Sequence, residues 1–193
     1  MRKLIAAFKT SLDGRTEGPQ GYADWVAAWS DDYGLTEQVD ACVLGGGMYP
    51  GYEQYWTTIQ NDPTGINPQT GTAPTAGEVE WARVASSTPH YVLSNTLTSA
   101  NWPNVQFLRS LDELAALKQQ EGRDIYLMGG ATIAASAIGG GIVDELRLIV
   151  YPLIVGEGSA LFATGGTRRA LELRSSEQLP DGTLSLVYGI GRD

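Results

Sequence analysis

The 193-residue chain contains one cysteine, Cys42, and one histidine, His90. A single cysteine cannot form an internal disulfide, and the two residues together are too few for a zinc ligand set or a cysteine–histidine nucleophilic pair. Cys42 lies in an apolar run typical of a core strand, so we interpret it as a buried thiol. His90 opens another predicted strand and is interpreted as structural. We therefore expect no metal site.

Positive charge is also scarce, since 13 Lys and Arg residues face 22 Asp and Glu residues, for a formal net charge of −9. A nucleic-acid partner requires a basic face, so we expect none. No apolar run approaches the roughly 18 residues of a membrane span. The N-terminal apolar run is too short for a signal peptide and is interrupted by Lys9. We expect a soluble, cytoplasmic protein with no membrane partner.

The composition is otherwise that of an ordinary globular protein, with 42% hydrophobic and 18% charged residues. The length suits one domain, which we place at 1–193. The predicted strands are Lys3–Lys9, Ala41–Leu44, His90–Ser94, Val105–Leu108, Asp124–Met128, Glu145–Tyr151, Ala170–Ser175 and Thr183–Gly189. The predicted helices are Tyr22–Asp32, Met48–Thr57, Leu111–Glu121 and Thr132–Ile138.

Strands alternate with helices over the first two-thirds of the chain, which predicts an α/β fold with a mainly parallel sheet. The last third has no predicted helix and ends in two strands around Pro180–Gly182, which indicates an antiparallel hairpin. Residues 61–77 are rich in Thr, Pro and Gly and predict a long surface loop. Loops of this length are usually lids or mobile segments, and the sequence does not choose between the two.

The segment Ile125–Thr132 predicts a buried strand that stops at two glycines and turns directly into a helix. Glycines at such a turn remove the Cβ atoms that would hold a ligand away from the backbone. The helix start supplies free N–H groups and the positive end of a dipole. The same arrangement occurs at Ala41–Gly47, followed by Met48 and Tyr49. Two such turns indicate a nucleotide with more than one phosphate, although each alone also fits a purely structural glycine.

Several motifs then occur in a fixed order along the chain: Ser11-Leu-Asp-Gly14, Gly45-Gly-Gly47, Tyr91-Val-Leu-Ser94 followed by Asn95-Thr96, Met128-Gly-Gly-Ala-Thr132, and Gly156-Glu-Gly-Ser-Ala-Leu-Phe162. Together they resemble the dihydrofolate-reductase-like superfamily. The closer resemblance is to the reductase domain of bifunctional riboflavin-biosynthesis deaminase–reductases. The zinc motifs of the deaminase half are missing, which implies a stand-alone reductase-like domain. The implied fold has three layers, with a mostly parallel central sheet of about eight strands between helices.

The resemblance implies a reductase that moves hydride from NADPH, with NADH as an alternative, to a planar pyrimidine- or pterin-like small molecule. The cofactor would lie across the carboxyl ends of the strands. Homodimerisation is implied as well. The implied cofactor-binding residues are Gly45, Gly46, Gly47, Met48, Tyr49, Ser94, Asn95, Thr96, Gly129, Gly130, Ala131 and Thr132.

Asp13 and Trp25 match the family's catalytic and substrate-binding positions in type and spacing, and Trp25 could stack on a planar substrate. Both keep a structural alternative. Asp13 with Gly14 also suits a tight turn, and Trp25 with Trp29 also fits a core stripe. The aromatic residues of the helix predicted at Met48–Thr57 are expected to serve packing more than ligand binding.

Three departures limit the resemblance. Asn95 stands where the family often has an arginine for the 2′-phosphate, and Met128 stands where pyrimidine reductases carry an acid. No Lys or Arg occurs between Asp24 and Val79, which counts against a phosphorylated substrate. Asp31 and Asp32 are candidates for a proton-donating acid by helix position only. Two alternatives therefore stay open, namely an inactive nucleotide- or ligand-binding protein of the same fold and a flavin- or deazaflavin-dependent reductase.

Overall fold

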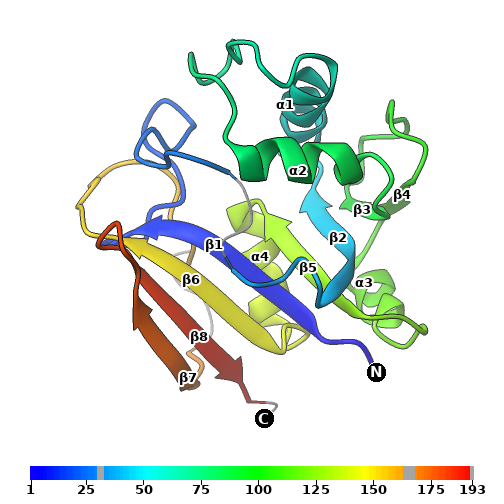
Figure 1. The fold of residues 1–193 in the computed structure, drawn as a ribbon. Helices are drawn as coiled ribbons and strands as arrows, with labels where there is room; N and C mark the ends of the chain where they lie inside the picture. The colour runs from blue at the N-terminus through cyan, green and yellow to red at the C-terminus, as the bar shows by residue number, and fades with distance from the viewer. Residues whose placement is uncertain (30–32, 163–167, 192–193) are drawn as a thin grey trace.

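The structure is a computed structural model that describes residues 1–29, 33–162 and 168–191. An eight-stranded sheet lies at the centre of the molecule (Figure 1). The strands are β1 (Leu4–Ser11), β2 (Val39–Gly45), β3 (His90–Leu93), β4 (Val105–Leu108), β5 (Asp124–Gly129), β6 (Glu145–Tyr151), β7 (Leu171–Gln178) and β8 (Leu184–Ile190). Their order across the sheet is β4-β3-β2-β5-β1-β6-β8-β7. The pairs from β4 to β6 are parallel, whereas β8 runs antiparallel to both β6 and β7.

The central strands are apolar on both faces because helices cover both faces. Every residue of β1 is buried, and β2 and β5 are almost as fully enclosed. Uniform rather than alternating apolar runs are the expected sequence pattern for such strands. They place the carboxyl ends of β1, β2 and β5 side by side at one edge of the core.

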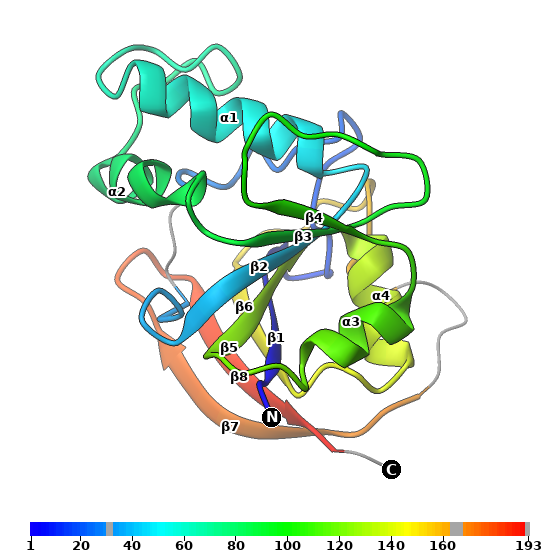
Figure 2. The ribbon, with the colours of Figure 1, turned by 90° about the vertical axis from the view of Figure 1, so that its right-hand side faces the viewer.

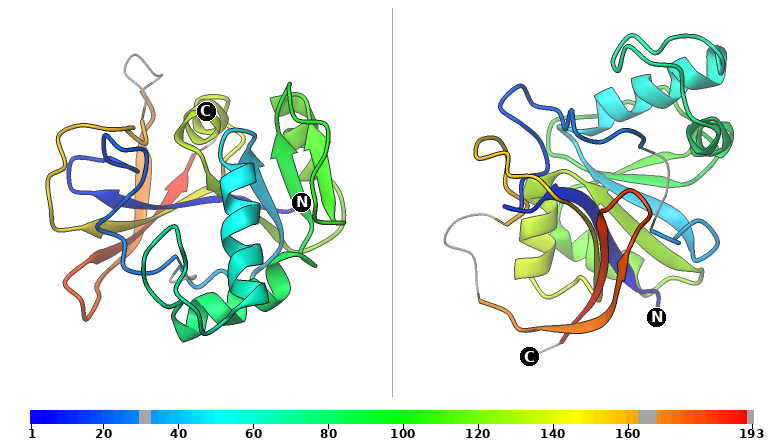
Figure 3. Two further views of the ribbon diagram at one scale, coloured as in Figure 1. Left: turned by 90° about the horizontal axis from the view of Figure 1, so that it is seen from above. Right: turned by 60° about the vertical axis from the view of Figure 1, so that its left-hand side comes forward.

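The helices are α1 (Tyr49–Asn61), α2 (Ala76–Ala85), α3 (Leu111–Leu117) and α4 (Ala131–Gly139). Figure 2 shows α1 and α2 on one side of the sheet and α3 and α4 on the other. Each pair packs on its own hydrophobic cluster, with Tyr49 and Trp56 in the first and Leu114 and Ile133 in the second. Figure 3 shows the β7–β8 hairpin at the edge of the sheet far from β4. The predicted α/β layers and antiparallel hairpin are confirmed.

All eight predicted strands and three of the four predicted helices are present, with ends that differ by a few residues. The helix predicted at Tyr22–Asp32 is wrong, because 22–29 is irregular backbone; residues 30–32, with Asp31 and Asp32, lie outside the described residues. Helix α2 was not predicted. Its start was readable, since Thr75 and Glu78 form a capping box. The loop predicted at 61–77 spans 62–75 between α1 and α2.

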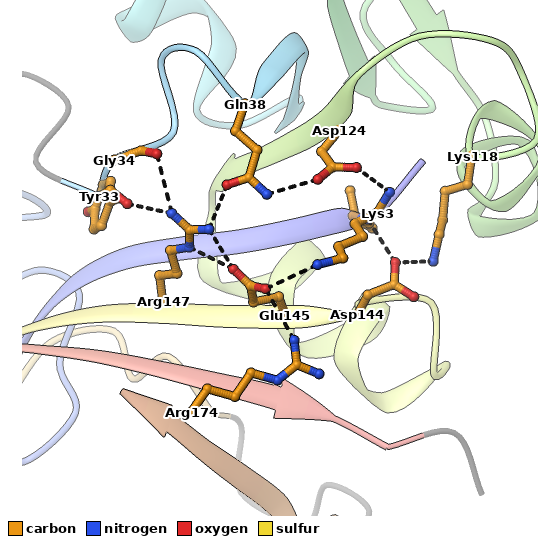
Figure 4. Close-up of polar contacts among 11 residues, drawn as sticks. Lys3, Tyr33, Gly34, Gln38, Lys118, Asp124, Asp144, Glu145, Arg147 and Arg174 are labelled. Atoms are coloured by element: carbon orange, nitrogen blue, oxygen red, sulfur yellow. Dashed lines mark hydrogen bonds and ion pairs between the residues drawn. The ribbon is translucent and has the colours of Figure 1, made fainter. Parts of the chain in front are cut away.

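A polar cluster on the sheet holds the segment that follows residue 32 (Figure 4). The guanidinium of Arg147, on β6, donates to the carbonyl oxygen of Tyr33 at 2.6 Å and to Gln38 Oε1 at 2.7 Å. The buried carboxylate of Glu145 accepts from Arg147 at 2.7 Å and is paired with Lys3 as well. Arg147 therefore fixes where Tyr33 lies against the sheet, and Tyr33 is one wall of the cavity described next.

Candidate active site

A cavity of about 710 Å³ opens where β1, β2 and β5 end. In open α/β sheets, ligands bind at the carboxyl ends of the strands. The walls come from segments that are far apart in the sequence: the strand ends, the starts of α1 and α4, the irregular segment after β1, part of α2, and Gln69 on the 62–75 loop. The fold therefore brings the glycine turns and an aromatic-rich helix to the same space.

Both glycine turns border this cavity. Gly45, Gly47 and Met48 line it from the β2–α1 turn. Gly129, Gly130, Ala131 and Thr132 line it from the β5–α4 turn, and the Gly129–Gly130 peptide bond is cis. A Cβ added to Gly130 or to Gly47 would meet no atom within 4 Å, so the space in front of both residues is open. Backbone this exposed to a cavity can approach a ligand closely.

The two helices that start at the cavity are the two without a side-chain cap. Helix α4 begins after Gly130 and α1 after Met48, and neither N-cap residue has a side chain that accepts a bond from the helix. By contrast, Thr75 caps α2 and Ser110 caps α3. The first N–H groups of α4, and those of Tyr49 and Gly51 on either side of Pro50 in α1, are therefore without a side-chain cap, at helix ends where the dipole favours an anion.

Some of the predicted cofactor-binding residues do not line the cavity. They are Gly46, Tyr49 and the loop after β3, Ser94–Thr96. Gly46 fits closely under Ser94, since an added Cβ would lie 2.5 Å from the Ser94 side chain. Tyr49 is 1% exposed, and its hydroxyl donates to Glu53 at 2.6 Å, so its role in the structure is packing. Ser94 Oγ accepts from the N–H of Thr96 at 3.3 Å and shapes the loop. Asn95 and Thr96 are exposed beside the glycine turn.

Sequence reasoning missed Arg109, which lies directly after β4. One nitrogen, Nη1, donates to the carbonyl oxygens of both Ser94 and Leu97, the second at 2.9 Å. The guanidinium carbon is 5.5 Å from the centre of the Phe107 ring. A cation thus lies at the loop where Asn95 supplies none. Strands β3 and β4 are parallel neighbours, so their carboxyl ends lie side by side. That pairing could have indicated that Arg109, after β4, lies near Ser94, after β3.

Asp13 lies on the turn after β1 and does not line the cavity. Its carboxylate accepts from Ser11 Oγ at 2.6 Å, from the N–H of Val155 at 3.0 Å and from the N–H of Gly156 at 2.9 Å. The Ser11 hydroxyl and then the two backbone N–H groups hold the pKa of Asp13 far below its usual range. Asp13 is therefore a carboxylate near neutral pH, and its geometry ties the 152–156 segment to β1.

Trp25, the predicted stacking residue, does not line the cavity, whereas Trp29 does. The indole nitrogen of Trp25 is buried and has no hydrogen-bond partner among the described residues. The indole of Trp29 is 41% exposed, and its backbone N–H donates to Glu78 Oε1 at 2.9 Å. A large, partly exposed aromatic side chain at a cavity wall is a contact surface for a ligand.

Three of the four α1 aromatics that we expected mainly to pack, namely Tyr52, Tyr55 and Trp56, line the cavity and are buried as well. The Tyr55 hydroxyl donates to Glu78 at 2.8 Å. The pKa of Tyr55 is raised, mainly by burial and also by this carboxylate. Burial likewise raises the pKa of Tyr52, whose hydroxyl lies 3.1 Å from His90 Nε2. Both phenols are therefore held neutral.

Few charged side chains reach this space. Among the described residues, only Lys9 and Glu17 line it. Lys9 Nζ donates to the carbonyl oxygen of Ala28 at 2.6 Å, and Glu17 accepts from the Ser159 hydroxyl. The described residues also contain no group of three or more His, Cys, Asp or Glu that could hold a metal ion. No helix in the described part of the chain is long and apolar enough to cross a membrane.

Comparison with known proteins adds to this geometry. Residues 2–185 match the family model of the RibD C-terminal domain. YyaP of Bacillus subtilis (strain 168), which is uncharacterised, is 30% identical over 192 residues, covering 97% of this chain and 94% of YyaP.

Two solved structures share the fold. A protein from Shewanella sp. PV-4, named for riboflavin biosynthesis, superposes with a TM-score of 0.71 at 21% identity, over 98% of this chain and 99% of that one. Dihydrofolate reductase from Enterococcus faecalis, solved with NADP(H), superposes with a TM-score of 0.63 at 15% identity, over 98% and 97%. These likenesses confirm the predicted dihydrofolate-reductase-like fold.

Proposed function

This chain belongs to the RibD C-terminal domain family, and on that premise we propose that it is a reductase that uses a nicotinamide cofactor to reduce a planar heterocyclic small molecule. One observation carries the proposal. A single cavity has two unlike sides. One side has open glycines and uncapped helix starts, which suit phosphates. The other side is a wall of aromatic rings, which suits a planar acceptor. The acceptor would gain a hydride from the cofactor and a proton from solvent, and the nicotinamide would be oxidised.

The residues at the glycine edge fit a dinucleotide. The N–H groups at the start of α4, from Ala131 and Thr132, would hold the pyrophosphate, and the open space at Gly130 would admit it. The turn Gly45–Met48 and the start of α1 would take part as well. Ser94–Thr96 would lie at the adenosine ribose, beside the cation of Arg109. When bound, the cofactor would supply hydride from C4 of the nicotinamide.

Asp13 and Trp25 do not take their predicted roles in this proposal. Asp13 is held as a carboxylate and so has no proton to give near neutral pH. It would instead keep the 152–156 segment in place beside the end of β1. Trp29 would take the stacking role that the sequence suggests for Trp25, because it is the tryptophan of this segment that lines the cavity.

A catalytically inactive ligand-binding protein is the second candidate. It is favoured by Met128, which lines the cavity where pyrimidine reductases carry an acid, and by the engagement of Asp13 away from the cavity. Binding alone does not separate the two candidates, because both would hold a nucleotide at the glycine edge. Turnover with a pterin or pyrimidine acceptor does.

We further propose a cytoplasmic homodimer. The chain has no cysteine pair to form a disulfide of the kind that stabilises many secreted proteins. Strand β7 is an edge strand whose eight residues are all exposed, with Leu171 and Leu173 among them. An exposed edge with apolar side chains is suited to pair with a second copy.

The experiment that tests the reductase proposal is titration of the purified protein with NADPH and NADH, followed by quenching of tryptophan fluorescence. Trp29 and Trp56 line the cavity and should report binding. Micromolar binding of NADPH, followed by its oxidation when a pterin or pyrimidine acceptor is added, is the expected result. Absence of binding in protein shown to be folded would overturn the proposal, and yellow purified protein would point to a flavin.

A further inference from the structure

The part of the cavity on the α1 side is walled by aromatic rings. Tyr52, Tyr55 and Trp56 come from α1, Trp81 from α2 and Tyr126 from β5. These rings also contact one another edge-on, with Tyr55 and Trp56 at 4.9 Å and Trp56 and Trp81 at 6.4 Å between centroids. Such contacts fix the rings in place before a ligand arrives.

The hydroxyls of Tyr52 and Tyr55 in this wall are already satisfied by the protein. Tyr55 donates to Glu78, and Tyr52 accepts from the indole of Trp81 at 3.2 Å and lies within hydrogen-bond distance of His90. A buried hydroxyl with its partners in place has little to gain from a ligand. The wall therefore offers the apolar faces and edges of its rings rather than polar groups.

Charged side chains are scarce in this cavity. No arginine is among its described lining residues, and its one cation, Lys9, is 5% exposed and donates to Ala28. Residues 30–32 and 163–167, which lie outside the described ranges, contain no Lys or Arg in the sequence. The whole chain carries a net charge of −9. The proposed function gives the uncapped helix starts to the cofactor. An anion against the aromatic rings would then lose its water without gaining a cationic side chain as a partner, in the field of a negatively charged chain.

We propose that this aromatic compartment, defined by Tyr52, Tyr55, Trp56, Trp81 and Tyr126, binds a neutral and unphosphorylated ring system and discriminates against anionic acceptors. The inference rests on the proposed function, since it names the substrate class of that same cavity. It also separates this chain from a reductase that grips a ribose phosphate. Trp29, 41% exposed at the cavity wall, supplies the side chain that covers the bound ring.

The first test compares ligands that share a ring and differ in charge. The neutral probe is 6-methylpterin and the anionic probe is pterin-6-carboxylate, with uridine and uridine 5′-monophosphate as a second pair, each titrated by calorimetry. The expected result is that each neutral compound binds at least about tenfold more tightly than its charged partner. Equal or tighter binding of the charged partner would overturn the inference, as would failure of both neutral probes to bind.

The second test adds a cation. Gln69 lines the cavity from an exposed position on the 62–75 loop, so Gln69→Lys can be made without disturbing the core. This variant is expected to gain about tenfold in affinity for pterin-6-carboxylate and to leave 6-methylpterin within about twofold. Thr70→Lys, at the next position and exposed but outside the lining, is the matched control and should change neither. A gain in both variants would mean that net charge alone is responsible.

Titration of the same samples with NADPH separates the two proposals. Protein that binds 6-methylpterin but no NADPH would contradict the proposed function and leave the ring compartment standing. Protein that binds NADPH but prefers the charged probes would contradict the inference and leave the reductase standing. Trp29→Ala should weaken the binding of 6-methylpterin at least about fivefold and leave the affinity for NADPH unchanged. Phe162 is an exposed aromatic residue outside the lining, so Phe162→Ala should change neither affinity.

Discussion

The guanidinium of Arg109 donates a hydrogen bond of 2.9 Å to the carbonyl oxygen of Leu97. The same nitrogen, Nη1, also donates to the carbonyl oxygen of Ser94, so the side chain spans the loop that carries Asn95. Within the described residues, the other two guanidinium nitrogens make no hydrogen bond. A cation fixed at one nitrogen with donors to spare is suited to a phosphate.

The first prediction follows for cofactor choice. If Arg109 supplies the charge that Asn95 lacks, Arg109→Ala should weaken the binding of NADPH by about tenfold or more. The affinity for NADH should not change, because only NADPH has the 2′-phosphate. Arg83→Ala, at an exposed site on α2, is the charge-matched control. Both constants can be measured by fluorescence titration. Equal losses for the two dinucleotides would mean that Arg109 only shapes the loop.

The second prediction concerns the start of α4. Gly130→Ala adds a methyl group where the structure leaves space, at φ −74° and ψ 174°, so the variant should fold normally. That methyl group would lie where a pyrophosphate approaches the helix, and NADPH affinity should fall at least tenfold. Gly139→Ala, at the other end of α4 and equally free of contacts, should leave affinity unchanged. Similar affinities for the two variants would contradict the placement of the phosphates.

The third prediction uses the single histidine. Burial lowers the pKa of His90 from 6.5 to about 4, so the folded protein keeps the imidazole neutral while the unfolded chain binds a proton. Stability should therefore fall as the pH drops from about 6.5 towards 4, by about 3 kcal/mol from this residue. The imidazole signals in NMR belong to one residue and should not titrate above pH 5 or so. A midpoint near 6.5 would show that His90 is accessible to water.

The elements that the sequence predicts correctly share a simple cause. Strands buried on both faces are largely apolar, so β1 and β5 stand out, and glycines mark where β2 and β5 end. These are local signals. They are enough to place the glycine turns at one edge of the sheet, on the side of the cavity where we propose that phosphates bind.

The wrong helix and the missed helix have a common explanation in Glu78. Its carboxylate closes the capping box that starts α2 and also accepts from the backbone N–H of Trp29. Backbone groups of the 22–29 segment are thus bonded to distant side chains, with Lys9 donating to Ala28 in the same way. Helical spacing of Trp25 and Trp29 cannot reveal such partners. The same limit hid the aromatic compartment, since its hydroxyl partners lie on α2 and β3.

The fourth prediction tests the association of two copies. Leu173 on the edge strand β7 is 54% exposed. If β7 pairs with a second copy, analytical ultracentrifugation should give a dimer for the unmodified protein and mostly monomer for Leu173→Lys. Val84→Lys, on α2 and 45% exposed, is the matched control and should stay dimeric. A monomeric unmodified protein would refute the homodimer directly.

The last prediction concerns Asp13 and pH. Because the folded-state pKa of Asp13 lies below its ordinary value of 3.8, the carboxylate stabilises the fold at neutral pH. That contribution must decline as the pH falls through 3.8, because Asp13 then becomes protonated in the unfolded chain while it stays deprotonated in the folded protein. Asp13→Asn places an amide against the N–H groups of Val155 and Gly156 and should be less stable than the unmodified protein at neutral pH.

The difference between the two proteins should shrink when urea unfolding is repeated near pH 3. Asp24→Asn is the matched control, because Asp24 is exposed and makes no hydrogen bond within the described residues. It should show no difference at either pH. If Asp13 instead donated protons in catalysis, Asp13→Asn would abolish turnover while leaving stability and its pH dependence intact. A stable but inactive variant would thus return Asp13 to the catalytic role that the sequence suggests.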